Sequence, residues 1–385
     1  MKRVLLLGAG KIGRMISRFL TDTGDYAVCV ADVDQVALER LEQQIPGIET
    51  RPINAADHAD LVAAMTTREI VVSALSFHFN PGVARAALEA GVSYFDLTED
   101  IATTRAVRLV ATDARPGQIF MPQCGLAPGF VSIVTSHLTD WFDELHTVRM
   151  RVGALPLFPS NALKYNLTWS TDGLINEYCN PCEAIHEGKR VDRNPLEGQE
   201  EFSLDGVRYE AFNTSGGLGT LCETLEGRVR SLDYKTIRYL GHRELVDFLL
   251  NELRMKDRRA QLKEILEAAI PITYQDVVVI FCTVTGLRKG RFVQHSDARK
   301  IYHQQIAGES WSAIQVTTAA GICAAIDLHA TGRLPAQGFV RQEQIPFTEF
   351  LANRFGRHYE PNGQNAFSRS DIRLQDEVSQ DIRTA

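Results

Sequence analysis

Two short apolar runs near the start of the chain enclose a segment with helical periodicity. Residues 4–7 (VLLL) and 26–31 (YAVCVA) are apolar throughout, which is typical of strands buried inside a parallel sheet. Between them, apolar residues recur at steps of three and four, as on one face of a helix: Ile12, Met15, Ile16, Phe19 and Leu20. The pattern predicts a strand, a helix and a second strand in that order.

The alternation of strands and helices continues as far as residue 123. A third strand is predicted at 48–53, and further strands are predicted at 70–75, 92–97 and 118–123. The segments between them predict helices at 36–45, 59–65, 80–91 and 100–114. In the third of these helices we expect Asn80 to be the N-cap, with a proline in the first turn. Such strand–helix repeats predict an α/β fold with a doubly wound parallel sheet.

Beyond residues 126–129 (LAPG) the pattern changes. Strands are predicted at 147–154 and within 228–239, and hairpins at 200–213 and 277–295. Helices are predicted at 130–138, 262–269, 313–330 and 347–354. Because helices alternate here with antiparallel strands, we expect a second domain of the α+β class.

A glycine-rich turn, GAGKIG, follows the first strand directly. Gly8 permits a tight turn, Gly10 lets the backbone approach a pyrophosphate, and Gly13 lets the helix pack against the strand. The start of the helix offers free N–H groups and a positive dipole end to phosphates. The turn therefore predicts a dinucleotide site, with an empty or adapted fold as the alternative. Its expected cofactor-binding residues are Gly8, Gly10, Lys11 and Ile12.

An acidic residue ends the second strand. Asp32 lies 19 residues beyond Gly13, where a carboxylate can accept both ribose hydroxyls of NAD. No Ser-Arg pair follows it to hold a 2′-phosphate, so the sequence favours NAD over NADP. Ligands of such sheets bind at the carboxyl ends of the strands. Four more residues there are therefore cofactor candidates: Asp57, Ser73, Ala74 and Leu75.

A chain of 385 residues is too long for one ordinary core, so two domains are expected. We predict a dinucleotide-binding domain at 1–125 and an α+β domain for substrate binding and dimerisation at 126–312. Residues 313–360 are expected to return as helices to the first domain, and 361–385 to form a polar tail.

Candidate substrate residues occur in both halves. Asp96, at the end of a strand, could accept a substrate ammonium or a ribose hydroxyl, or simply begin a helix; Cys124 could line the nicotinamide pocket or be a small core residue. Four polar or aromatic residues could form a substrate wall, an anion-binding loop, or merely core and turn: Tyr165, Trp169, Thr214 and Ser215.

Three basic residues lie close together in YKTIRYLGH (234–242). Lys235 or Arg238 could bind a carboxylate, and His242 could act as a base or orient one; the alternative is a solvated strand edge with a packed histidine. On a strand, Lys235 and Ile237 would share one face and Arg238 the other.

Composition and net charge limit the kinds of partner and the cellular location that we expect for the protein. The net charge of −7 argues against nucleic acid. We see no signal peptide and no apolar stretch long enough to span a membrane, so a cytoplasmic protein is expected. Seven dispersed cysteines fit reduced thiols, and the single CxxC, Cys179 to Cys182, lacks the second pair that a structural zinc site needs. No metal is expected.

With its second half in view, the chain resembles the saccharopine dehydrogenase-like reductases, and within them most closely the L-lysine 6-dehydrogenases. The similarity rests on the glycine turn with Asp32, on VVSALSFHFN (71–80), GLAPG (125–129), NTSGG (213–217) and YKTIRYLGH. The resemblance implies a Rossmann doubly wound parallel sheet with an inserted α+β substrate domain, commonly as a homodimer. It also implies NAD-dependent oxidation of a C–N bond in an amino acid.

In a lysine 6-dehydrogenase the ε-carbon gives hydride to NAD, ammonia is released and the semialdehyde cyclises. The alternatives within the resemblance act on a secondary amine: saccharopine dehydrogenases, and carboxynorspermidine dehydrogenases, which usually take NADP. Two further alternatives are a hydroxy-acid dehydrogenase, against which the second domain argues, and a non-catalytic dinucleotide-binding sensor. Any amine oxidation needs a general base, a cation for the carboxylate and a closed cleft over the nicotinamide.

Overall fold

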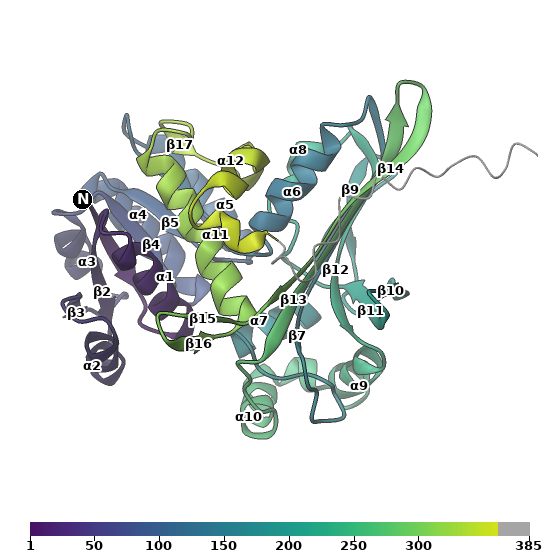
Figure 1. Ribbon diagram of the computed structural model, residues 1–385, viewed down its shortest axis with the longest axis horizontal. Helices are drawn as coiled ribbons and strands as arrows, with labels where there is room; N and C mark the ends of the chain where they lie inside the picture. Colours follow the sequence, from purple (N-terminus) through teal and green to yellow (C-terminus); the bar gives the residue numbers. More distant parts are fainter. Residues whose placement is uncertain (361–385) are drawn as a thin grey trace, which may run out of the picture.

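The computed structural model describes residues 1–360, and the expected polar tail lies outside the described residues. A seven-stranded sheet forms one side of the molecule and a larger mixed sheet the other (Figure 1). The strands of the first sheet run parallel in the order β17-β6-β5-β4-β1-β2-β3. This doubly wound α/β sheet confirms the predicted fold class.

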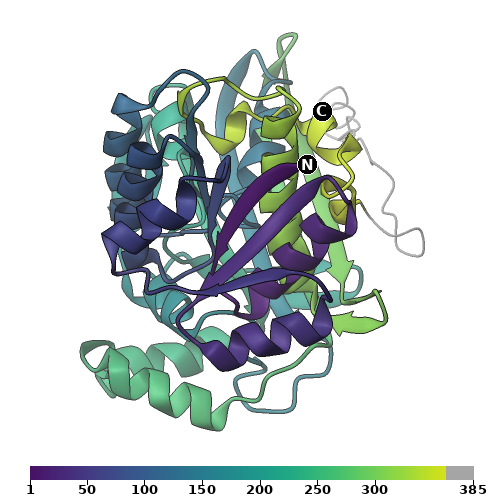
Figure 2. The ribbon, with the colours of Figure 1, turned by 90° about the vertical axis from the view of Figure 1, so that its left-hand side faces the viewer.

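Six strands of the first sheet lie where the sequence predicts strands, within a few residues, and the seventh, β17, was not predicted. The strands are β1 (Lys2–Leu7), β2 (Tyr26–Asp32), β3 (Glu49–Pro52), β4 (Ile70–Ser73), β5 (Ser93–Asp96) and β6 (Ile119–Met121), joined by β17 (Gly338–Phe339). The helices are α1 (Lys11–Asp22), α2 (Gln35–Gln44), α3 (His58–Met65), α4 (Asn80–Ala90) and α5 (Ile101–Val110). Figure 2 looks onto this sheet and its covering helices.

The prediction for Asn80 as an N-cap is wrong. Asn80 is already in the helix, and its side chain makes no cap hydrogen bond. Instead it accepts a hydrogen bond from Ser73 and donates one to Asp96, both of them buried. The tertiary partners of the amide therefore override its local preference for capping.

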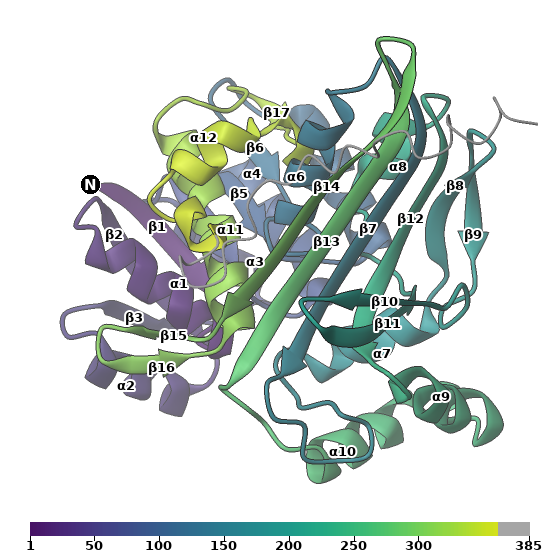
Figure 3. The same ribbon diagram turned by 45° about the vertical axis from the view of Figure 1, so that its right-hand side comes forward.

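The second sheet is mixed, with the path β10-β11-β12-β7-β13-β14 and a side hairpin of β8 and β9 on β12 (Figure 3). Its strands are β7 (Glu144–Pro156), β8 (Cys182–His186), β9 (Lys189–Arg193), β10 (Glu200–Leu204), β11 (Val207–Asn213), β12 (Val229–Tyr239), β13 (Asp276–Arg288) and β14 (Arg291–Tyr302). Both predicted hairpins are present. The pair β12 and β7 is parallel, and the other pairs are antiparallel.

Helices and short strands complete the second half of the chain. They are α6 (Phe130–Thr139), α7 (Thr171–Cys179), α8 (Leu221–Leu225), α9 (His242–Asp247), α10 (Arg259–Ala269), α11 (Ala313–Ala330), α12 (Phe347–Ala352), and the hairpin of β15 (Gln304–Ile306) and β16 (Glu309–Trp311). A π-helical turn at Phe248–Glu252 extends α9. Several elements of the second half of the chain were not predicted from the sequence: α7, α8, α9 and the hairpins β8–β9 and β15–β16.

Helix α11 lies between the two sheets, packed on α1, β5 and β13 (Figure 1). It is apolar on all sides because it is buried on all sides. By length and composition its 18 residues could cross a membrane, which corrects the expectation that no stretch is long enough. However, 83% of it is buried inside the protein. Tyr26 of β2 donates a hydrogen bond of 2.6 Å to Asp327 near its end.

Candidate active site

The glycine turn has the geometry that a pyrophosphate requires. Gly8 adopts a φ of +105°, and a Cβ on Gly13 would lie 1.9 Å from the Gly8 carbonyl oxygen. In contrast, a Cβ on Gly10 would meet nothing within 4 Å. No side chain caps the start of α1, and its first turn holds no acidic residue. The residues present therefore fit the phosphates of a dinucleotide, which would be held by the first amides of α1.

Asp32 lies beside this turn. Its carboxylate accepts hydrogen bonds from the backbone amides of Ala9, at 2.7 Å, and Asp34, at 2.9 Å. These two bonds fix the carboxylate at the end of β2, and each oxygen keeps acceptor capacity for a ribose hydroxyl. The arrangement fits a dinucleotide bound across the carboxyl ends of the strands.

The other cofactor candidates are distributed around this edge of the sheet. Ile12, Ala74 and Leu75 line the large cavity described below. Ser73 is buried and bonded to Asn80, while Asp57 is exposed and caps α3. Lys11 begins α1, and burial lowers the pKa of its ammonium although Glu267 of α10 opposes the shift.

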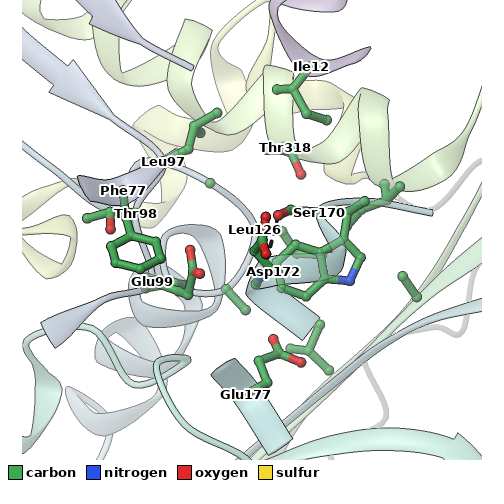
Figure 4. Close-up of a pocket in the computed structure, with 18 of the residues that line it drawn as sticks. Ile12, Phe77, Leu97, Thr98, Glu99, Leu126, Ser170, Asp172, Glu177 and Thr318 are labelled. Atoms are coloured by element: carbon green, nitrogen blue, oxygen red, sulfur yellow. Dashed lines mark hydrogen bonds between the residues drawn. The ribbon is translucent and has the colours of Figure 1, made fainter. Parts of the chain in front are cut away.

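A cavity of about 1150 Å³, counting the part open to solvent, separates the first sheet from the second. One wall is formed by the loops after β4, β5 and β6 and by the start of α11. The opposite wall is formed by β7, β12 and α7. Figure 4 shows side chains from both walls, including Ile12, Leu97, Thr318 and Glu177, around one space. A cleft between domains, at the carboxyl ends of parallel strands, is where such folds bind ligands.

Three carboxylates line this cavity: Glu99, Asp172 and Glu177 (Figure 4). The pKa of Glu99 is raised to about 7, chiefly by burial and to a lesser extent by the neighbouring carboxylates of Asp100 and Asp96. Burial likewise raises the pKa of Glu177 to about 8, although Arg238 lowers it. Such shifts bring both groups to the pH range in which a carboxylate can take up and release a proton during catalysis.

Arg238 is the one basic side chain among the described residues that line the cavity. It is 3% exposed, and its guanidinium lies over the ring of Tyr165 at 5.1 Å. Its Nη2 lies 3.8 Å from Glu177, which is an ion-pair distance but longer than a hydrogen bond. The guanidinium is therefore held at the cavity wall as a fixed positive charge.

The structure separates the three basic residues that are neighbours in the sequence. β12 alternates as expected, with Tyr234, Thr236 and Arg238 facing the cavity. Lys235 does not line it, and lies 3.5 Å from Glu200 in an ion pair. His242 is also outside the cavity lining, buried behind Tyr178. Only Arg238 of the three is placed to touch a ligand there.

Asp96 and Cys124 are buried below the cavity floor. Asp96 accepts hydrogen bonds from Tyr94, Asn80 and the backbone amides that follow β5 and β6. Burial raises its pKa to about 6 despite these bonds. Burial also raises the pKa of the Cys124 thiol, which is bonded to Gln342. Neither side chain lines the cavity, so both support the loops that do.

Of the expected substrate wall, only Trp169 lines the cavity. The ring of Tyr165 contacts the guanidinium of Arg238 without lining the cavity, and the segment 213–217 packs against two residues that do line it, Glu99 and Tyr234. Within it, a Cβ on Gly216 would lie 2.8 Å from the Glu99 carbonyl oxygen, and one on Gly217 would collide with the Tyr234 ring at 2.2 Å. Thr214 and Ser215 are buried there without facing the cavity. The glycines therefore permit close packing around Glu99 and Tyr234.

Glu99 and Glu177 were missed by the sequence interpretation. Glu99 lies three residues after Asp96, in the same loop after β5. Glu177 lies on α7, whose signal was present: Ser170 caps the helix through the amide of Gly173, and apolar residues follow at helical spacing. Among the described residues, no group of three or more His, Cys, Asp or Glu side chains could hold a metal ion.

The glycine turn with Asp32, and a cavity closed by a second domain, define a two-domain protein of the dinucleotide-binding class. Residues 4–117 match the saccharopine dehydrogenase NADP-binding domain, and residues 125–357 match the saccharopine dehydrogenase C-terminal domain. The chain belongs to the saccharopine dehydrogenase family. Members of this family are NAD(P)-dependent oxidoreductases of lysine metabolism that act on CH–NH donors, so the resemblance at the family level is confirmed.

Known relatives match half of the chain or more in sequence. The mouse mitochondrial alpha-aminoadipic semialdehyde synthase is 23% identical over 382 residues, or 93% of this chain and 37% of that protein. The NADP(+)-dependent, L-glutamate-forming saccharopine dehydrogenase of Schizosaccharomyces pombe is 22% identical over 201 residues, or 50% of this chain and 44% of that protein. The chain thus spans less than half the length of these relatives.

A solved structure shares the whole fold. The apo saccharopine dehydrogenase (L-Glu forming) of Saccharomyces cerevisiae superposes with a TM-score of 0.76 at 17% identity. The match covers 92% of this chain and 98% of the yeast chain. It confirms that a parallel sheet of the Rossmann type and a mixed-sheet domain belong together in one protein.

Proposed function

We propose that the protein is an NAD-dependent amino-acid dehydrogenase that oxidises the primary ε-amine of L-lysine, releasing ammonia. The observation that carries this proposal is the charge of the cavity, where Arg238 faces three carboxylates: Glu99, Asp172 and Glu177. Lysine complements it, because it brings one carboxylate and two amines. A substrate with more carboxylates would leave some of them against like charges.

Each group has a role in this scheme. Arg238 binds the α-carboxylate of the substrate through a charge-assisted hydrogen bond. Glu99, with its pKa near 7, takes the proton of the reacting ammonium, since the amine must be neutral before hydride leaves its carbon. Glu177, when deprotonated, attracts an ammonium group into the cavity, and Asp172, which pairs with Lys263 at 2.6 Å, adds to the negative charge at its edge. The dinucleotide, held by the glycine turn and Asp32, supplies the hydride acceptor.

The second candidate is oxidation of saccharopine, a secondary amine. It is favoured by the names of the relatives, which are saccharopine dehydrogenases or a semialdehyde synthase. However, saccharopine carries three carboxylates, and Arg238 is the single cation among the described residues lining the cavity. The charge balance therefore supports lysine over saccharopine.

A panel of amines tests the proposal directly. L-lysine, saccharopine, a carboxylated polyamine and a 2-hydroxy acid are each incubated with NAD or NADP, and reduced cofactor and ammonia are both measured. We expect reduced NAD and ammonia in equal amounts with lysine. Oxidation of saccharopine with lysine inert would overturn the proposal in favour of the second candidate, and dinucleotide binding without any turnover would indicate a sensor.

The choice of NAD over NADP is part of the proposal and rests on Asp32, because the family model itself is of an NADP-binding domain. Replacing Asp32→Ala is expected to weaken NAD binding by about 10- to 150-fold, as loss of hydrogen bonds to a charged group does. NADP binding should be unchanged or tighter, because the carboxylate repels a 2′-phosphate. Titration of both cofactors against wild type and variant measures this.

The control for that experiment is Asp32→Asn. It keeps an oxygen that can accept the hydrogen bond of the Ala9 amide, so the turn retains its shape. If the ratio of NAD to NADP affinity were the same in wild type and in Asp32→Ala, the argument for NAD would be wrong. If both variants lost both cofactors equally, Asp32 would serve the turn alone.

A further inference from the structure

A chain of buried hydrogen bonds leads away from the cavity behind Arg238. Arg238 Nε donates to the hydroxyl of Tyr178 at 2.8 Å, and that hydroxyl lies 2.9 Å from Nε2 of His242. Nδ1 of His242 lies 2.8 Å from the carbonyl oxygen of Leu163. Tyr178 and His242 are 6% and 2% exposed, and neither lines the cavity.

The donor and the acceptor of each hydrogen bond in this series follow from the groups at its two ends, the Leu163 carbonyl and the Arg238 guanidinium. The Leu163 carbonyl can only accept, so Nδ1 of His242 must carry the proton. Nε2 is then an acceptor, so the Tyr178 hydroxyl donates its hydrogen bond to Nε2 and accepts the one from Arg238 Nε. Burial lowers the pKa of His242 to about 3, with a further contribution from Arg238, so the imidazole is neutral. Burial also raises the pKa of the Tyr178 hydroxyl, which therefore keeps its proton.

These hydrogen bonds leave the Nη2 edge of the Arg238 guanidinium free. Nε is bonded to Tyr178, and Nη1 donates to Thr236 at 2.5 Å and to the Ile237 carbonyl at 2.9 Å. Within residues 1–360, the only contact of Nη2 given by the structure is the ion pair with Glu177 at 3.8 Å. The two N–H groups of Nη2 therefore remain available to a ligand in the cavity.

We propose that Tyr178 and His242 are positioning residues that hold Arg238 in one orientation for the substrate carboxylate, and so determine the preference for α-amino acids over simple amines. The inference rests on the proposed function for the identity of the amine. Without the Tyr178 hydroxyl, the guanidinium keeps its charge but loses one of the three hydrogen bonds that fix its orientation, the one on the side of Nε. The effect therefore falls on recognition of the carboxylate and not on the reacting amine.

The test compares L-lysine with 1,5-diaminopentane, which is lysine without its carboxylate. Binding of both is measured by equilibrium titration of the enzyme loaded with reduced NAD, and kcat and KM are measured with NAD. We expect Tyr178→Phe to raise the Kd and KM for lysine about tenfold while kcat stays within twofold. The values for 1,5-diaminopentane and the KM for NAD should not change.

Two further variants separate positioning from general loss of structure. Tyr239→Phe is the matched control, since it removes a hydroxyl that bonds the Pro156 carbonyl on the opposite face of β12, and it should leave the lysine constants unchanged. His242→Gln keeps an oxygen that can accept the hydrogen bond from the Tyr178 hydroxyl, so it should raise the Kd for lysine less than His242→Leu does.

The outcomes are distinct. The inference is supported if the wild type binds lysine more tightly than 1,5-diaminopentane and the Tyr178→Phe variant loses this preference. This holds even if lysine is bound but not oxidised, a result that would refute the proposed function alone. An unchanged preference in Tyr178→Phe would overturn the inference, and so would a wild type that binds lysine no better than 1,5-diaminopentane or not at all. An equal loss for both ligands would mean that Tyr178 only maintains the fold.

Discussion

Glu99→Gln is expected to lower kcat/KM for amine oxidation by about 10²- to 10⁴-fold, the usual contribution of a general base. Glutamine has the size of glutamate and cannot take a proton. The Glu99 carboxyl lines the cavity, and burial raises its pKa to about 7. Because the base works only when it is deprotonated, kcat/KM of the wild type should rise with pH through about 7 and then level off.

The pH profile distinguishes this role from a structural one. In Glu99→Gln the rise near pH 7 should disappear, and the melting temperature should stay close to that of the wild type because a buried charge is removed. The acids that face Glu99 are Asp96, Asp100 and Glu177. Glu177→Gln is the matched control, since it removes a neighbouring carboxylate and should keep the rise. A profile that keeps its rise in Glu99→Gln and loses it in Glu177→Gln would assign the base to Glu177.

The parallel sheet could be predicted from the sequence because its signals are local. Most of its strands are short apolar runs, the helices between them follow within a few residues, and the glycine turn joins the first strand to the first helix. The polar strand β3 and the short edge strand β17 lack this signal. The burial that makes α11 apolar on every side also made it easy to find, and its bounds are those predicted. The hairpin at 200–213 was equally clear, because Asp205 and Gly206 both adopt the positive φ that a two-residue turn needs.

The opposite wall of the cavity depends on contacts between distant segments, which no local pattern reveals. Glu177 of α7 lies 3.8 Å from Arg238 of β12, and the hydroxyl of Tyr178 contacts a histidine that is 64 residues away in the sequence. Lys235 and Arg238 are three residues apart, yet the alternation of β12 sends them to opposite faces. The sequence could therefore identify the segment that carries the cation but not the residue. For His242 it left a base and a packed histidine open, and the structure shows a packed histidine outside the cavity lining.

Gly13→Ala and Gly10→Ala are expected to fail in different ways, although each adds one methyl group to the same turn. At Gly13 the new Cβ would lie 1.9 Å from the carbonyl oxygen of Gly8, so α1 must move away from β1. Such overpacking costs about 1–3 kcal/mol and lowers the melting temperature by roughly 2–12 °C. Cofactor affinity should also fall, because the amides of α1 shift with the helix.

At Gly10 the added methyl group meets no protein atom within 4 Å, and the φ of −71° suits alanine. The melting temperature without cofactor should therefore stay within about 2 °C of the wild type, as for surface substitutions that disturb no contact. The methyl group occupies the space that a pyrophosphate needs, so the Kd for NAD should rise at least about tenfold, the effect of roughly 1.4 kcal/mol. Thermal melts with and without NAD measure both effects. A Gly10→Ala protein that bound NAD as tightly as the wild type would show that the cofactor does not approach this turn, because no other consequence of the methyl group would compensate for the lost space.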